Sequence, residues 1–76
     1  MPDVQGNRQS KGVTYKNSDV VRIVNEYIHS SRDRDIAVDR LVNGLTIEQL
    51  AEKYERTPRA MQTKVAKLQA IVFRYL

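Results

Sequence analysis

Apolar residues recur every three or four positions from about residue 17 to the C-terminus, and no stretch alternates for the length of a strand. The pattern divides into four amphipathic stretches separated by polar breaks, and it predicts helices over about 18–29, 33–43, 46–55 and 58–75. The expected apolar stripes are, in chain order, Val20, Ile23, Val24, Tyr27 and Ile28; Ile36, Ala37, Val38, Leu41 and Val42; Ile47, Leu50, Ala51 and Tyr54; and Met61, Val65, Leu68, Val72 and Tyr75. The fold class is therefore all-α, with one small domain at residues 17–76.

Boundary signals are strongest at the third and fourth helices. Thr46, followed three residues later by Gln49, matches a capping box, in which each side chain satisfies a free backbone N–H of the other residue. Thr57 can cap the fourth helix, with Pro58 at the first helical position, where a missing N–H costs nothing. Because the two caps are eleven residues apart, the sequence predicts a helix-turn-helix within a small trihelical or four-helix domain.

The expected turn has a glutamate where many such turns carry glycine. We place Glu55 in this slot, where a side chain near the left-handed region costs roughly 1 kcal/mol. Ala51 is small and lies in mid-helix, so we expect the fourth helix to cross the third closely.

Polar residues mark the ends of the first two helices. We expect Asn17 or Ser18 to cap the first helix, and Ser30 or Ser31 to cap the second. The Asn43-Gly44 pair is expected to end the second helix.

Charge is segregated along the chain. The net charge is +4, yet residues 19–55 hold eight acidic against five basic residues, and residues 56–76 hold five basic residues and no acidic one. This distribution favours a polyanion as the partner of the fourth helix, although an ordinary solvated helix has the same composition.

The outer face of the fourth helix carries residue types that suit the major groove of DNA. Arginine and glutamine can pair with guanine and adenine edges, threonine and alanine can approach thymine methyl groups, and lysine can contact phosphates. The candidate contacts are Arg56, Thr57, Arg59, Gln62, Thr63, Lys64, Lys67 and Arg74.

Two stretches carry a family resemblance: Gly44-Leu45-Thr46-Ile47-Glu48-Gln49-Leu50-Ala51 and Arg56-Thr57-Pro58-Arg59-Ala60-Met61. The segment resembles region 4 of the bacterial sigma factors and small sigma-like or homeodomain-like phage and bacterial regulators. With the preceding helices, the likeness covers about two thirds of the chain. It implies double-stranded DNA as a partner and RNA polymerase or another host protein as a further one.

Residues 1–16 have no apolar period and contain glycine, proline and many polar residues, so we expect a flexible arm. Its three basic residues, Arg8, Lys11 and Lys16, can lie along DNA as homeodomain arms do. We nevertheless expect the arm to be simply disordered, and contact along DNA is the alternative.

The C-terminal end has more apolar surface than one helix face needs. We expect part of it to pack on the first helix and the rest to form a homodimer contact or to fill a partner's groove. The candidate contacts are Ile71, Val72, Phe73, Tyr75 and Leu76.

Several kinds of chemistry are not expected from this composition. There is no cysteine for a disulfide or a thiolate metal site. Asp33, Asp35 and Asp39 alternate with arginines and lack calcium-loop spacing, so we expect ion pairs rather than a metal site. His29, the only histidine, lies at a helix end. We therefore expect no cofactor and no enzyme activity.

The chain has no apolar run long enough for a membrane span and no signal peptide, which predicts a cytoplasmic or nucleoid-associated protein. Two functions remain open. The first is a small DNA-binding regulator or accessory factor. The second is a protein–protein adaptor or inhibitor that uses the same body on another protein.

Overall fold

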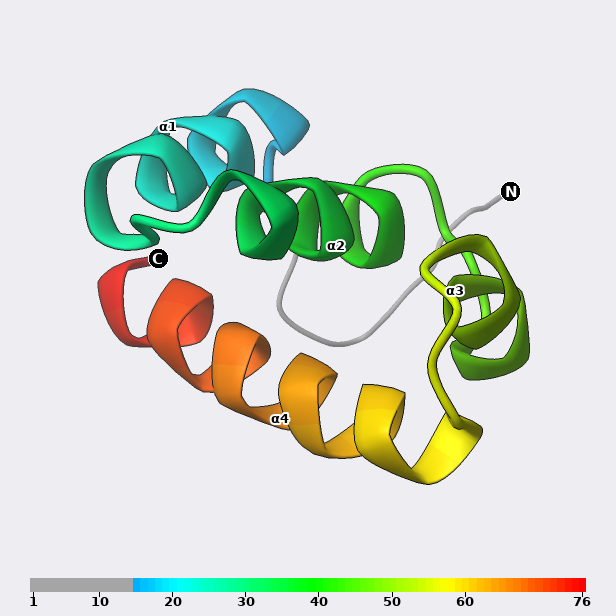
Figure 1. The fold of residues 1–76 in the computed structure, drawn as a ribbon. Coiled ribbons are helices and arrows are strands. Elements are labelled where there is room, and N and C mark those ends of the chain that lie inside the picture. Colours follow the sequence, from blue (N-terminus) through cyan, green and yellow to red (C-terminus); the bar gives the residue numbers. More distant parts are fainter. Residues whose placement is uncertain (1–14) are drawn as a thin grey trace, which may run out of the picture.

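The computed structural model describes residues 15–76, which form four helices (Figure 1). They are α1 (Asn17–Tyr27), α2 (Ser31–Leu41), α3 (Ile47–Lys53) and α4 (Pro58–Tyr75). No strand occurs within this range, so the all-α fold is confirmed. Most of the predicted arm, including Arg8 and Lys11, lies outside the described residues.

The helices form two layers, with α4 running beneath the other three (Figure 1). Both α2 and α4 contact each of the other helices, whereas α1 and α3 lie at opposite ends of the molecule. The start of α4 is next to α3, and its C-terminal end lies under α1 (Figure 1). One long helix therefore spans the whole domain.

Apolar residues of all four helices meet in one core. The buried set is Val20, Ile23, Val24, Ile28, Ile36, Ala37, Leu50, Ala51, Met61, Val65, Leu68 and Val72. This confirms most of the predicted stripes. Tyr27 and Tyr75 are exceptions, because they are 41% and 43% exposed.

The start signals of α3 and α4 are confirmed. The Thr46 hydroxyl accepts a hydrogen bond from the Gln49 N–H at 3.1 Å, and the Thr46 N–H donates to the Gln49 side chain at 2.8 Å. The Thr57 hydroxyl accepts from the Ala60 N–H at 3.1 Å. Each cap satisfies a donor that the helix itself leaves free.

The first residues of α1 and α2 differ from the predicted bounds, although the predicted serine cap of α2 is confirmed. Lys16 occupies the N-cap of α1 and makes no side-chain capping bond, so the expected cap at Asn17 or Ser18 was wrong. Ser30 caps α2 by accepting from the Asp33 N–H. As a result α2 begins and ends two residues earlier than the predicted 33–43.

The turn between α3 and α4 is held by backbone hydrogen bonds. Glu55 has a φ of 57°, which confirms its predicted place in the left-handed region. The Arg56 N–H donates to the Ala51 carbonyl at 2.8 Å, and the Glu55 N–H donates to the Glu52 carbonyl at 3.3 Å. These two bonds form a Schellman motif, which ends α3 and directs the chain into α4.

Candidate nucleic-acid interface

The outer face of α4 is exposed and basic. Its exposed polar residues, together with those just before the helix, are Arg56, Thr57, Arg59, Gln62, Thr63, Lys67 and Arg74. The opposite face carries the buried Met61, Val65, Leu68 and Val72. No ion pair joins Arg56, Arg59, Lys67 or Arg74 to a carboxylate of residues 15–76. Their positive charges are therefore uncompensated by the described part of the chain.

Two threonines of the candidate set use their hydroxyls within the protein. Thr57 caps α4 through Ala60. The Thr63 hydroxyl donates to the Arg59 carbonyl one turn earlier, at 3.2 Å. The Thr63 hydroxyl is therefore already engaged, and Arg59 and Gln62 are the long polar side chains near the start of α4.

The start of α4 offers few free backbone donors. Pro58 has no N–H, the Ala60 N–H bonds to the Thr57 hydroxyl, and the Met61 N–H donates to the Thr57 carbonyl at 2.9 Å. Only the Arg59 N–H is left in the first turn. The start of α4 therefore provides little backbone hydrogen bonding to a phosphate.

Lys64 differs from the other basic residues of α4. Its ammonium nitrogen lies 3.3 Å and 3.4 Å from the two carboxylate oxygens of Asp33 on α2. The lysine side chain is 32% exposed and the aspartate side chain 23%. This ion pair ties α4 to α2 and neutralises one charge of the predicted DNA-binding set.

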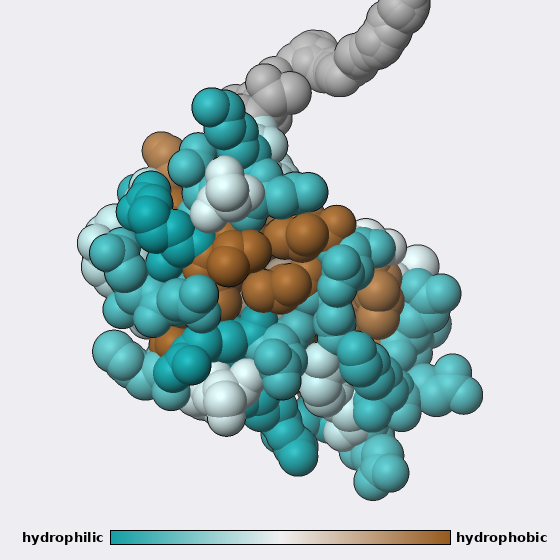
Figure 2. All heavy atoms as spheres, turned by 90° about the horizontal axis from the view of Figure 1, so that it is seen from above, coloured by the Kyte–Doolittle hydropathy of each residue, from teal (hydrophilic) through white to brown (hydrophobic). Residues whose placement is uncertain are grey.

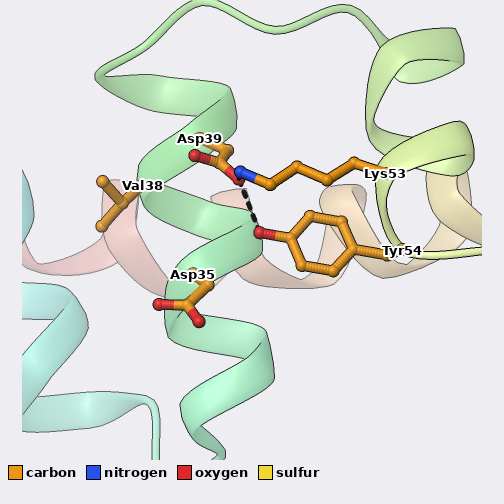
Figure 3. Close-up of a pocket in the computed structure, with 5 residues that line it drawn as sticks. All are labelled: Asp35, Val38, Asp39, Lys53 and Tyr54. Atoms are coloured by element: carbon orange, nitrogen blue, oxygen red, sulfur yellow. Dashed lines mark hydrogen bonds and ion pairs between the residues drawn. The ribbon is translucent and has the colours of Figure 1, made fainter.

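A second aspartate of α2 holds α3 in place. The Asp39 carboxylate accepts from the Lys53 ammonium at 2.7 Å, from the Tyr54 hydroxyl, and from the Asn43 amide at 2.9 Å. Figure 3 shows Lys53 and Tyr54 converging on Asp39 across an open pocket that Asp35 and Val38 also line. The cluster joins α2 to the C-terminal end of α3.

Hydrogen bonding sets the ionisation of this cluster. Burial alone would raise the pKa of Asp39, but the hydrogen bonds from Lys53, Tyr54 and Asn43 outweigh burial and lower the pKa below its usual value. Burial, followed by the hydrogen bond to Asp39, raises the pKa of the Tyr54 hydroxyl. The cluster is stable as a carboxylate with a neutral tyrosine.

The expected ion pairs form at Asp33 and Asp39, but their partners are lysines and not the neighbouring arginines, so that part of the prediction was wrong. Arg34 instead donates to the Ile28 and His29 carbonyls, at 2.7 Å and 3.0 Å, and so caps the end of α1. Arg40 donates to the Leu45 carbonyl at 2.7 Å. Sequence neighbours point to different sides of a helix, whereas lysines on other helices reach the aspartates.

The predicted C-terminal contact surface is only partly available. Val72 is fully buried, so its assignment as an oligomer contact was wrong. The Tyr75 ring stacks on Tyr27 of α1, and the Phe73 ring lies 6.0 Å from that of Tyr15. Phe73, Tyr75 and Leu76 keep 43% to 49% of their surface exposed, while Ile71 is partly buried.

Apolar surface is also exposed on the side away from α4. Figure 2 shows apolar side chains in a strip across the face that carries α1 and α2, surrounded by hydrophilic ones. Partly buried apolar residues of α2 and the residue after it are Val38, Leu41 and Val42, and Val21 of α1 is 36% exposed. Exposed apolar surface therefore occurs both on this face and at the C-terminal end of α4.

Neither a metal-binding cluster nor a membrane-spanning helix is found within residues 15–76. No group of three or more histidine, cysteine, aspartate or glutamate side chains in this range is placed to hold a metal ion. None of the four helices combines the length and hydrophobicity needed to cross a bilayer.

No protein-family model matches this chain, and no curated protein or solved structure matches it significantly.

Proposed function

We propose that this protein binds double-stranded DNA by placing the start of α4 in the major groove, as a small transcriptional regulator or accessory factor of the cytoplasm or nucleoid. One observation carries the proposal. The outer face of α4 exposes Arg59, Lys67 and Arg74, Arg56 is exposed just before the helix, and the chain has no acidic residue after Glu55. A helix is the right width for the major groove, and uncompensated basic side chains supply the attraction to phosphates.

The position of each residue along α4 decides whether it is assigned to DNA bases or to the phosphate backbone. Arg59 and Gln62 lie in the first turns, from which they can pair with guanine and adenine edges. Arg74 is fifteen residues beyond Arg59, a separation of about 22 Å along the helix axis. A straight helix leaves the groove over such a length, so Arg74 and Lys67 are assigned to phosphates.

The acidic residues next to α4 restrict how DNA approaches. Glu48, Glu52 and Glu55 are exposed on α3 and in the turn. Their carboxylates repel backbone phosphates, so DNA is expected to meet α4 with α3 held clear of the backbone. The attraction is modest for one domain, and useful specificity needs a second copy or a larger complex.

Fluorescence anisotropy with a labelled random-sequence duplex at several salt concentrations tests the proposal. Neutralising several phosphates predicts a log–log salt slope of magnitude about 3 or more. A wild-type protein that fails to bind the duplex at low salt contradicts the proposal.

A protein–protein adaptor or inhibitor is the second candidate, and the exposed aromatic end of α4 favours it. Phe73, Tyr75 and Leu76 remain about half exposed although they lie next to α1. Aromatic and aliphatic side chains of this kind are typical anchors of protein interfaces. RNA polymerase, another host protein or a second copy of the chain would be the partner, and capture of purified RNA polymerase on the immobilised protein tests the first of these.

A further inference from the structure

Lys64 sits at the edge of the basic face of α4. At about 100° per residue it lies about 60° around the helix from Lys67, which is fully on that face. Its long flexible stem can place the ammonium group toward the same side. The structure instead has this ammonium against Asp33 of α2, at 3.3 Å and 3.4 Å from the two carboxylate oxygens.

Asp33 is less buried than Asp39 and has fewer hydrogen-bond partners. Asp39 is almost fully buried and accepts from three side chains, so it is part of the packing between helices. The Asp33 carboxylate has Lys64 as its side-chain partner among residues 15–76, and both side chains are in contact with solvent. The pair is therefore partly buried but not sealed from solvent, so the Lys64 ammonium can exchange Asp33 for another anion.

We propose that Asp33 lowers the DNA affinity of this protein by occupying Lys64 and cancelling its charge at the edge of the α4 interface. The inference rests on the proposed function, because it concerns the strength of the same site. Binding to DNA releases one condensed counterion for each phosphate that an uncompensated cation neutralises. With Lys64 paired to Asp33, this lysine releases none, and Asp33 acts as an internal competitor of the phosphate backbone.

Two lysines three residues apart provide the first test. Anisotropy titrations of a labelled duplex over a range of salt concentrations give the log–log slope for each variant. Lys67→Ala removes an unpaired cation and is expected to reduce the slope magnitude by about 0.9, whereas Lys64→Ala is expected to leave it unchanged. Equal reductions in the two variants would overturn the inference.

Releasing Lys64 provides the second test. Asp33→Asn keeps the shape of the side chain but removes its charge, and it is expected to steepen the slope by about 0.9. Asp35→Asn on the same helix removes an equal charge from an exposed residue without an ion pair among residues 15–76, and it is expected to leave the slope unchanged. In Asp33→Asn/Lys64→Ala the slope is expected to return to the wild-type value.

The outcomes separate the inference from the function on which it rests. An unchanged slope in folded Asp33→Asn, in a wild-type protein that binds DNA, overturns the inference alone. The absence of duplex binding by the wild type and by Asp33→Asn contradicts both. Thermal unfolding of each variant shows that it is folded in the assay, and the comparison of Lys64→Ala with Lys67→Ala decides the matter if Asp33→Asn does not fold.

Discussion

Tyr27 at the end of α1 and Tyr75 at the end of α4 stack face to face, with ring centroids 3.7 Å apart and ring planes inclined by 1°. Phe73, two residues earlier, meets Tyr15, which lies just before the start of α1, with 6.0 Å between ring centroids. At about 100° per residue, Phe73 and Tyr75 lie on opposite flanks of α4, and Val72 enters the core. Thus α1 and the residue Tyr15 before it contact both flanks of the end of α4.

The tyrosine stack is expected to stabilise the last turn of α4. Because aromatic pairs contribute about 0.5–1.5 kcal/mol beyond their buried area, Tyr75→Ala should lower the free energy of unfolding by about 1 kcal/mol. Urea denaturation followed by circular dichroism measures the change. Tyr75→Phe keeps the ring and serves as the control. A loss of stability in Tyr75→Phe equal to that in Tyr75→Ala would show that the hydroxyl, not the stack, matters.

Phe73 is expected to act mainly at the surface. It is 49% exposed, so Phe73→Ser should leave the domain folded while weakening self-association or partner binding. Analytical ultracentrifugation of the wild type and of Phe73→Ser over a range of concentrations measures self-association. Val72→Ser is the buried counterpart and should be severely destabilised. If Phe73→Ser unfolds as well, its contact with Tyr15 belongs to the core.

Asp39 makes the free energy of unfolding depend on pH in the acid range. Its pKa is lower in the folded protein than its usual value of 3.8, so its contribution is present above that value and is lost as the pH falls through the folded pKa. Asp39→Asn is expected to cost about 1–3 kcal/mol at neutral pH and to flatten the decline of stability below pH ~4. Urea denaturation at a series of pH values measures both effects. If the stability of Asp39→Asn falls in acid as much as that of the wild type, the loss of stability is due to other carboxyl groups.

Glu55 is a site where glycine should be favourable. Its φ of 57° is accessible to glycine without a Cβ penalty. The relieved strain exceeds the added flexibility of the unfolded chain, so Glu55→Gly is expected to stabilise the domain by up to about 1 kcal/mol. Glu52→Gly, inside α3 and equally charged, is expected to destabilise it by a similar amount. Thermal unfolding of the two variants should therefore shift in opposite directions.

Arg59 is expected to be the main base-reading residue if α4 binds DNA. Arg59→Ala should cost about 1–3 kcal/mol in affinity and relax the base preference at one position of the selected site. Site selection followed by anisotropy measures both effects. Arg22→Ala, an exposed arginine of α1 that pairs with Glu26, removes the same charge away from α4. Equal losses in the two variants would show that only overall charge matters, and the recognition-helix assignment would fail.

Local chemistry determined much of this domain. The capping box of Thr46 and Gln49, the Thr57 cap and the left-handed position of Glu55 involve residues within a few positions of one another, so their geometry follows from local interactions. The stripe of α4 was equally predictable because it depends only on the helical period. The exposure of Arg59 and Gln62 follows from that stripe.

Tertiary structure decided the partners of the charged and aromatic residues. Asp33 reaches Lys64, 31 positions along the chain, and Asp39 reaches Lys53 and Tyr54, 14 and 15 positions along. Helical spacing in the sequence predicts which face of its helix a side chain occupies, but it does not predict which other helix packs against that face. The sequence predicted that part of the C-terminal surface packs on the first helix. It could not show that Tyr75 stacks on Tyr27, or that Lys64 is bound by Asp33 while Lys67 is not.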